Sequence, residues 1–359
     1  VGSFELNTTD VVSNYLGSGL SLNAVVVNNA GEQNTRVGRF VPAGFVLSGA
    51  SLTHRATAAC APASTFSYLG ENFQFDFTLT AQNALGAKTA NYHGDFARLS
   101  LSAPANLGLA GIEGSTLFKG AAIAPVSSSG NWVNGLAGDV KLIAAATRDP
   151  AAPSGPFANA QFGIAPLDPD GVTMRTFDLD TDSPANGADR SRLGVVPLRY
   201  GRLRLQNGIG SQERVLRLPL LAQYWTGSGF ATNTLDSCTR IRDTNLSFGN
   251  FRKGLAPADA VMQGSPLTLL NGEARLVLAA PAGARAGSYD VAIGIGPAAA
   301  QGQCSAPWVA PLKALTAGAN MDFLRGGWCG ANADKDPSAR DSFGLYRGND
   351  SMVYQRENY

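Results

Sequence analysis

Short segments in which apolar and polar residues alternate recur along the chain and constrain its fold more than any other feature. The clearest places Phe73, Phe75, Phe77 and Leu79 on one face, with a polar residue between each pair. Successive side chains of a β-strand point to opposite faces, so a period of two predicts a half-buried strand. Further segments of this kind are residues 45–51, 98–101, 140–144, 172–179, 201–205, 215–221, 274–278 and 289–295.

The composition agrees with a chain built from strands and turns. The 359 residues include 42 Gly and 19 Pro, and the charged residues are 22 Arg, 6 Lys, 20 Asp and 7 Glu. Lys and Glu, which favour helices, are therefore scarce, and turn-forming residues separate the alternating segments. We predict an all-β fold of tandem antiparallel β-sandwiches, immunoglobulin-like, with very little helix.

The spacing of the turn-rich segments predicts three regions. Residues 1–45 are too short to bury a core alone, so we expect them to form a β-segment that completes or links to a neighbouring domain. Residues 46–196 are predicted as a first β-sandwich, and residues 197–359 as a C-terminal β-sandwich.

The charge balance excludes some classes of partner. The net charge is +1, and the basic residues are scattered along the chain. A polyanion requires a concentrated basic patch, so we expect no nucleic-acid partner. No apolar run reaches the roughly 18 residues that a membrane helix needs, so no membrane span is expected.

The residues that nucleophilic catalysis requires are sparse. Only two histidines, His54 and His93, could serve as a general base, and each is interpreted as a surface or turn residue. No Gly-x-Ser-x-Gly sequence occurs in a strand–turn–helix setting. We expect that the chain is not an enzyme and has no catalytic residues.

Four cysteines lie too far apart for a thiolate zinc site. They are Cys60, Cys238, Cys304 and Cys329, and four thiols allow three complete pairings. Two disulfides, or one bridge with two buried free thiols, would both suit an exported protein. We predict a bridge between Cys238 and Cys304, because both lie in the predicted C-terminal domain.

Asp178, Asp180, Asp182 and Asp189 occupy positions one, three, five and twelve of a calcium-loop count. Ser183 stands where an EF-hand requires glycine, so an EF-hand is excluded. The spacing leaves two interpretations, a looser calcium-stabilised loop between β-domains or solvated loop acids. Calcium is the only cofactor that the sequence suggests.

Several strings in the C-terminal part resemble the C-terminal domain of the MSHA biogenesis protein MshQ family. These strings are residues 200–207, residues 218–230, Asp236-Ser-Cys-Thr239, Asp336-Pro-Ser-Ala-Arg340 and residues 343–350. The resemblance spans residues 37–359. It implies an exported bacterial protein linked to a type IV pilus of the mannose-sensitive haemagglutinin kind, and it transfers no catalytic residue.

These observations favour a non-enzymatic structural or adhesive protein of the bacterial surface, extracellular or on a pilus. Its expected partners are other pilus or cell-surface proteins, bound by addition of a strand to an exposed sheet edge, and possible glycans. The alternative is a secreted carbohydrate-binding module that stacks exposed aromatic residues on sugars, with Trp132, Trp225, Trp308 and Trp328 as the candidates.

Overall fold

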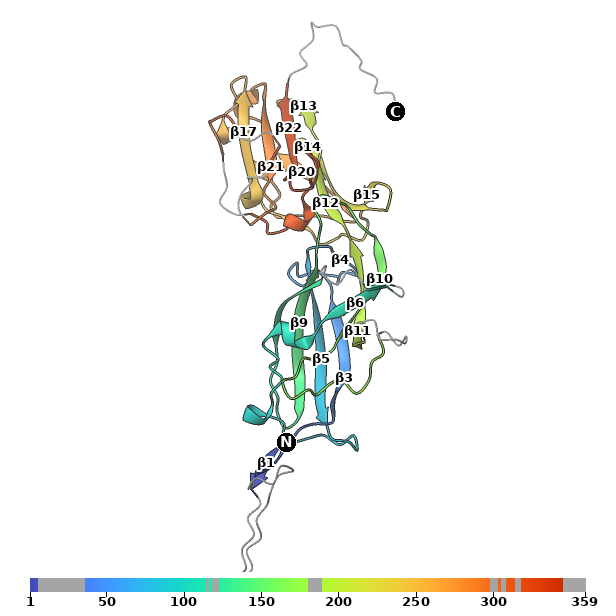
Figure 1. The fold of residues 1–359 in the computed structure, drawn as a ribbon. Helices are drawn as coiled ribbons and strands as arrows, with labels where there is room; N and C mark the ends of the chain where they lie inside the picture. Colours follow the sequence, from blue (N-terminus) through green and yellow to red (C-terminus); the bar gives the residue numbers. More distant parts are fainter. Residues whose placement is uncertain are drawn as a thin grey trace, which may run out of the picture.

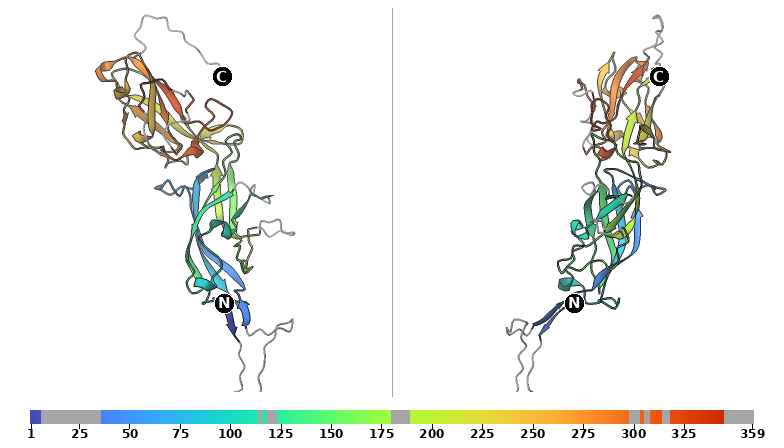
Figure 2. Two further views of the ribbon diagram at one scale, coloured as in Figure 1. Left: turned by 60° about the vertical axis from the view of Figure 1, so that its left-hand side comes forward. Right: turned by 45° about the vertical axis from the view of Figure 1, so that its right-hand side comes forward.

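The computed structural model describes residues 1–5, 36–113, 116–117, 123–179, 189–297, 303–304, 308–313 and 318–344. These residues form two β-sandwich domains that lie end to end (Figure 1), an arrangement that is also seen in the two other views of Figure 2. The predicted all-β architecture with very little helix is confirmed. Helical structure in the described part of the chain consists of short 3-10 turns, namely η2 (Gly94–Phe96), η3 (Pro104–Leu107), η5 (Asp243–Asn245), η6 (Pro257–Asp259), η7 (Ala282–Ala284) and η8 (Asp322–Leu324).

The first domain packs a four-stranded sheet against a five-stranded one. The first sheet has the order β3 (Gly44–Thr53), β5 (Asn72–Gln82), β9 (Leu136–Ala146), β8 (Ile123–Ser129) and is antiparallel throughout. The second has the order β4 (Ser67–Tyr68), β11 (Ser191–Arg199), β10 (Phe157–Ile164), β6 (Ala110–Glu113), β7 (Thr116–Leu117). Only β4 and β11 are parallel in this second sheet.

Strand β5 shows why the alternating sequence builds this domain. Its burial alternates strictly along all 11 residues, with the phenylalanines inward. The ring of Phe162 on the opposite sheet lies 5.4 Å from that of Phe73 and 6.2 Å from that of Phe75, between centroids. Aromatic rings at such distances add stability beyond the area that they bury. The period of two therefore fixes which face of the sheet meets the core.

The second domain is also built from sheets packed face to face. One sheet has the order β12 (Gly201–Leu205), β14 (Leu216–Trp225), β20 (Glu273–Leu278), β18 (Met262–Gln263), with β15 (Phe230–Thr232) paired to β14. Another has the order β13 (Gly208–Gly210), β22 (Ser338–Phe343), β21 (Gly287–Ile293), β17 (Leu246–Arg252). A short pair joins β16 (Arg240–Ile241) and β19 (Leu267–Thr268).

Two predicted strands of the first domain are wrong. Residues 98–101 and 172–179 belong to no strand, although Leu99, Leu101 and Met174 are buried. The backbone of residues 172–179 makes only a single bridge, between Met174 and Phe45. These residues are irregular segments whose apolar side chains pack on the core. The sequence pattern therefore predicted their burial correctly, but it predicted strand pairing that the backbone does not form.

At the N-terminal end, β1 (Gly2–Glu5) and β2 (Arg36–Phe40) form a separate antiparallel pair. Asn91 donates a hydrogen bond to the carbonyl of Val1 at 2.6 Å. Arg39 forms an ion pair with Asp170 at 2.7 Å. These contacts attach the pair to the first domain, while the boundary at residue 45 stays a prediction.

Where the domains meet, each hydrophobic core contains residues that come from the other domain. Phe66 and Tyr68, which precede β5 in the first domain, pack into the core of the second. In return, Ala333 of the second domain packs into the core of the first, and Trp225 and Phe230 lie against it. Burial is therefore continuous across the junction.

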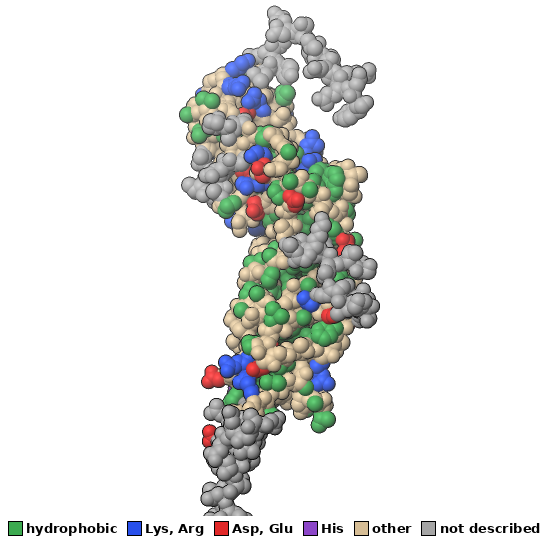
Figure 3. Space-filling view, viewed as in Figure 1, with side chains coloured by type: hydrophobic (Ala, Val, Ile, Leu, Met, Phe, Trp, Pro, Cys, Tyr) green, Lys and Arg blue, Asp and Glu red, His purple; other side chains and the backbone are tan. Residues whose placement is uncertain are grey.

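The surface charge and the helical segments bear on the expected partner classes, which stay predictions. Figure 3 shows few charged side chains on the visible face of the first domain between its two ends, and no continuous basic stripe on that face. None of the helical segments in the described residues has the length and apolar character required to cross a membrane.

Candidate functional site

A buried polar cluster with residues from both domains lies at their junction in the described structure. The loop after β3 brings Arg55 from the first domain, and the turn before β5 brings Glu71. The loop after β15 brings Asp236 and Thr239 from the second domain. We call these four residues with Tyr68 the junction network.

Arg55 is the centre of the junction network and is 1% exposed. Its Nε lies 3.0 Å from both carboxylate oxygens of Glu71. Its Nη1 donates to Asp236 Oδ1 at 2.7 Å, and its Nη2 donates to Thr239 Oγ1 at 2.8 Å. One guanidinium thus binds a carboxylate from each domain, which suits its planar arrangement of donors.

Asp236 is fully buried, and other groups complete its hydrogen bonding. It accepts the backbone N–H groups of Cys238 and Thr239 at 3.1 and 2.9 Å. The Tyr68 hydroxyl donates to Oδ2 at 2.9 Å, and the Asn233 amide donates to that hydroxyl at 2.7 Å. A carboxylate that accepts this many hydrogen bonds is stable in its ionised form in the protein interior.

The pKa shifts of the junction network follow from this geometry. Burial by itself would raise the pKa of Asp236, but the attraction of Arg55 and the hydrogen bonds from Thr239 lower it below its ordinary value. Burial opposes the charge of Arg55 too, yet the carboxylates of Glu71 and Asp236 raise its pKa. Burial, and then the charge of Asp236, raise the pKa of the Tyr68 hydroxyl. The network therefore holds Arg55 and Asp236 as an ionised pair.

A disulfide covalently joins the same two loops. Cys60 and Cys238 are bonded, and 178 positions separate them in the sequence. The second bridge, Cys304–Cys329, spans 25 positions within the second domain. Two disulfides are therefore confirmed, and the predicted Cys238–Cys304 pairing is wrong. The prediction assumed that bridges stay within a domain, whereas the loop carrying Cys60 reaches across to the second one.

A second arginine of the first domain also contacts the second domain at the junction. Arg148, which follows β9, donates from Nη1 to the carbonyl of Ala333 at 2.9 Å and from Nη2 to that of Arg325 at 2.6 Å. Its guanidinium carbon lies 4.2 Å from the centroid of the Tyr200 ring. Burial lowers the pKa of Arg148 below its ordinary value. The first domain therefore contributes two arginines, Arg55 and Arg148, to the contact.

The structure leaves the calcium hypothesis as a prediction. Asp180 and Asp182 lie outside the described residues. Asp178 Oδ1 accepts the backbone N–H of Arg192 at 2.7 Å, and Asp189 lies next to Arg190 in the segment leading to β11. Within the described ranges, no three His, Cys, Asp or Glu side chains gather as a metal site would require.

The candidate aromatic residues lie among other side chains. Trp132 packs against Phe45 at 5.5 Å between centroids and donates from Nε1 to the carbonyl of Leu99 at 3.1 Å. Trp308 is 9% exposed, and Trp328 lies under the Arg202 guanidinium at 4.9 Å. Trp225 contacts Phe230 with centroids 5.3 Å apart. Trp132, Trp225 and Trp328 are thus partly buried and Trp308 is buried, and the carbohydrate-binding alternative stays a prediction.

No motif or spacing in the sequence identifies Arg55, Glu71 or Arg148 as site residues. Asp236-Ser-Cys-Thr239 stands out in the sequence only through its resemblance to the MshQ family. An Asp followed by Ser and Thr favours a local turn in which the carboxylate accepts backbone N–H groups. That signal could have identified Asp236, but nothing near Arg55 in the sequence points to a partner 181 positions away.

The fold and the junction define the chain as a two-domain, disulfide-linked all-β protein. The chain belongs to the DUF6701 family, whose third domain matches residues 1–192 and whose fourth domain matches residues 199–358. No curated protein matches it.

Two solved structures show similarity to the chain. The adhesin InvE of Yersinia pseudotuberculosis is 9% identical with a TM-score of 0.23, and the alignment covers 84% of this chain and 58% of that one. A marsupial T cell receptor is 10% identical with a TM-score of 0.21, and the alignment covers 76% of this chain and 70% of that one. The chain thus spans little more than half of the InvE chain.

Proposed function

We propose that the chain is a non-enzymatic structural or adhesive part of a bacterial surface protein, associated with type IV pili of the mannose-sensitive haemagglutinin kind. The observation that carries the proposal is the junction, where a disulfide and a buried ion-paired network join two β-sandwiches end to end. Such a junction suits a protein that must hold a fixed extended shape outside the cell, where disulfides persist.

The pilus association is supported by the strings that resemble MshQ, including Asp236-Ser-Cys-Thr239. The structure gives this string a physical role, since Asp236 and Thr239 bind Arg55 and Cys238 bonds to Cys60. The resemblance therefore includes residues that build the junction.

The absence of catalysis is supported by the surroundings of His54. Its Nδ1 lies 3.3 Å from Ser67 Oγ, which is a spacing that a nucleophile and its base could have. Ser67 is fully buried, however, and its Oγ also accepts the backbone N–H of Arg55 at 3.2 Å. This burial keeps a substrate carbonyl from the hydroxyl, which supports a structural role for the pair.

The first test is the location of the chain. Surface fibres would be sheared from the producing cells and purified, and the chain would be quantified against the major filament subunit by mass spectrometry. We expect a reproducible signal in the fibres, at stoichiometric level for a shaft component and at trace level for a tip component. Reproducible absence from fibres that contain the major subunit would overturn the pilus association.

Strand addition is the proposed mode of assembly, with the region of residues 1–45 as donor or acceptor. Deleting residues 1–36 should abolish incorporation into fibres while the second domain keeps its cooperative unfolding. Normal incorporation of the truncated chain would contradict this mode. The calcium hypothesis has a separate test, because bound calcium would raise the melting temperature above that measured in chelator.

A further inference from the structure

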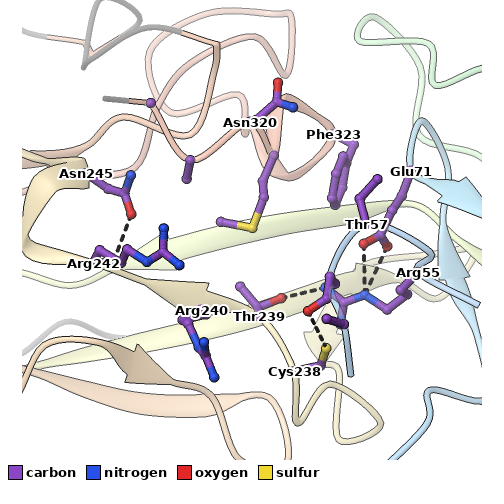
Figure 4. A pocket seen from close by; sticks show the side chains of 15 residues that line it. Arg55, Thr57, Glu71, Cys238, Thr239, Arg240, Arg242, Asn245, Asn320 and Phe323 are labelled. Carbon is purple, nitrogen blue, oxygen red and sulfur yellow. Dashed lines mark hydrogen bonds and ion pairs between the residues drawn. The ribbon is translucent and has the colours of Figure 1, made fainter. Parts of the chain in front are cut away.

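A pocket of about 360 Å³ opens at the junction beside the buried network. Its volume lies near the lower end of the range for small-molecule sites, roughly 300–1,000 Å³. Both domains line it, with Arg55, Thr57 and Glu71 from the first and Arg240, Arg242 and Asn320 from the second. Figure 4 shows Arg240 and Arg242 on the side of the pocket opposite Arg55 and Glu71.

Arg240 and Arg242 are placed as a pair by extended backbone. Arg240 lies in β16, and Arg242 follows directly with φ −105° and ψ 157°. Ile241 between them is fully buried. Alternate residues of extended chain leave on the same side, so burial of Ile241 sends both arginines to the opposite, solvent side, with Cα atoms about 7 Å apart.

These two guanidinium groups are available to a ligand. Both residues are exposed, and neither guanidinium forms a hydrogen bond or ion pair with any residue that the structure describes. Glu71, the one acidic residue of the lining, is already bound by Arg55 at 3.0 Å. The pocket therefore presents an excess of positive charge on one wall.

The remaining lining residues offer weaker, neutral contacts. The Thr57 hydroxyl and the Asn320 amide make no hydrogen bond within the described ranges, and both residues are exposed. Phe323 and Met321 add apolar surface. A pocket with paired cations, free hydroxyl and amide groups and a small apolar surface matches a ligand that carries one carboxylate, several hydroxyls and a compact ring.

We propose that this pocket binds a carboxylate-bearing saccharide, a uronic or sialic acid unit, with its carboxylate between Arg240 and Arg242. Guanidinium groups bind carboxylates through two parallel hydrogen bonds, which gives the pair its selectivity for an acidic sugar. Thr57 and Asn320 bind ring hydroxyls, and the apolar surface meets the ring. This inference goes beyond the structural role proposed above and does not depend on a pilus.

The test is a titration of the full chain by isothermal calorimetry with glucuronate and N-acetylneuraminate, and with glucose and N-acetylglucosamine as neutral counterparts. We expect at least one acidic sugar to bind tenfold or more tightly than the neutral ones. The R240Q/R242Q double variant should lose at least tenfold in that affinity. The R217Q/R275Q variant is the matched control, because those two exposed arginines lie on neighbouring strands β14 and β20 of the same domain.

Several results would overturn the proposal. They are no binding of either acidic sugar, equal binding of the neutral sugars, equal losses in the control and pocket variants, and inorganic phosphate binding as tightly as the sugar. The last result would reduce the site to a general anion site. Each of these results is independent of the fibre experiment. If the pocket binds no acidic sugar, the proposed surface function is not contradicted.

Discussion

Two fully buried carboxylates lie in different regions of the molecule and have opposite surroundings. Asp236 in the junction network accepts hydrogen bonds from Arg55, Tyr68, Thr239 and the backbone. Asp341, in β22 inside the second sandwich, is equally buried, but neither of its oxygens has a hydrogen-bond partner in the described structure. The junction therefore stabilises its buried charge, whereas the sandwich interior does not.

The difference appears as opposite pKa shifts. The pKa of Asp236 is lowered, and the pKa of Asp341 is raised well above its ordinary value, first by burial and then by the nearby charge of Asp290. Asp236 thus contributes stability above its ordinary pKa of 3.8, which is lost as the pH falls through its folded value. Asp341 acts in the opposite direction, since the folded state keeps a proton that the unfolded state loses above pH 3.8.

The largest expected effect comes from removing the disulfides. It tests whether the bridge at the junction contributes more to the free energy of unfolding than the bridge inside the second domain. A disulfide stabilises more as the loop it closes grows longer. Replacing Cys60 and Cys238 by Ser should cost about 5 kcal/mol in the free energy of unfolding, and replacing Cys304 and Cys329 by Ser about 3.5 kcal/mol. Urea unfolding under oxidising conditions measures both losses. If replacing Cys60 and Cys238 costs no more free energy of unfolding than replacing Cys304 and Cys329, the expected order of the two bridges is wrong.

The next effect tests the buried ion pair. The substitution Asp236→Asn keeps the shape of the side chain and removes its charge, which leaves Arg55 with a single carboxylate. Breaking a buried pair in this way costs about 3 to 5 kcal/mol. Asp334→Asn is the control, because that carboxylate is 47% exposed, and it should change stability by less than about 0.5 kcal/mol. Similar small changes in both variants would show that the network contributes little.

The substitution Asp341→Asn should stabilise the protein, whereas Asp236→Asn destabilises it. Because the folded protein must protonate Asp341 or bury its charge, whereas Asn is neutral in both states, the amide should raise the free energy of unfolding at pH 7 by about 1 kcal/mol or more. The gain should shrink as the pH falls toward the ordinary Asp pKa of 3.8, where both states carry the proton. Stability measured from pH 4 to pH 8 tests this. A gain that does not change with pH would argue against titration of Asp341.

The smallest effect concerns the neighbour of Asp341 in the same strand. Arg340 points outward and binds Asp290 through Nε at 2.7 Å and Nη2 at 3.0 Å. Its side chain is 44% exposed, so solvent screens the guanidinium, and the Asn250 amide, which donates to Asp290 Oδ2 at 2.7 Å, would still bind the carboxylate in its absence. Arg340→Gln should therefore cost about 1 kcal/mol or less, measured by the shift in the urea midpoint. A loss as large as that of Asp236→Asn would remove the distinction between surface and junction pairs.

The sequence predicted local features well because alternation is a local signal. Residues 201–205 were predicted as a strand and form β12, and the phenylalanines of β5 face the core as expected. The same signal failed at residues 98–101, where burial comes from a loop. Periodicity predicts which side chains are buried. Whether the backbone of a segment pairs as a strand depends on the neighbouring strands that the fold places beside it.

The candidate site depended on contacts that no local pattern encodes. Arg55 meets Asp236 only because a loop of one domain reaches the other, and Cys60 meets Cys238 for the same reason. The predicted Cys238–Cys304 pairing is wrong for this reason, because it assumed that both cysteines of a bridge belong to the same domain. Pairings between domains are determined by how the domains dock, which a single sequence does not display.

The Cys60–Cys238 bond also determines how the protein would carry tension between its two ends. A pull applied at residue 1 and at residue 344 would follow the chain to Cys60, cross the sulfur atoms to Cys238 and continue into β17. The intervening 178-position stretch, which includes β5, β9, β10 and β11, lies outside that path. About 600 Å of extended chain would thus stay outside the path of the force, even if the first sandwich lost its fold.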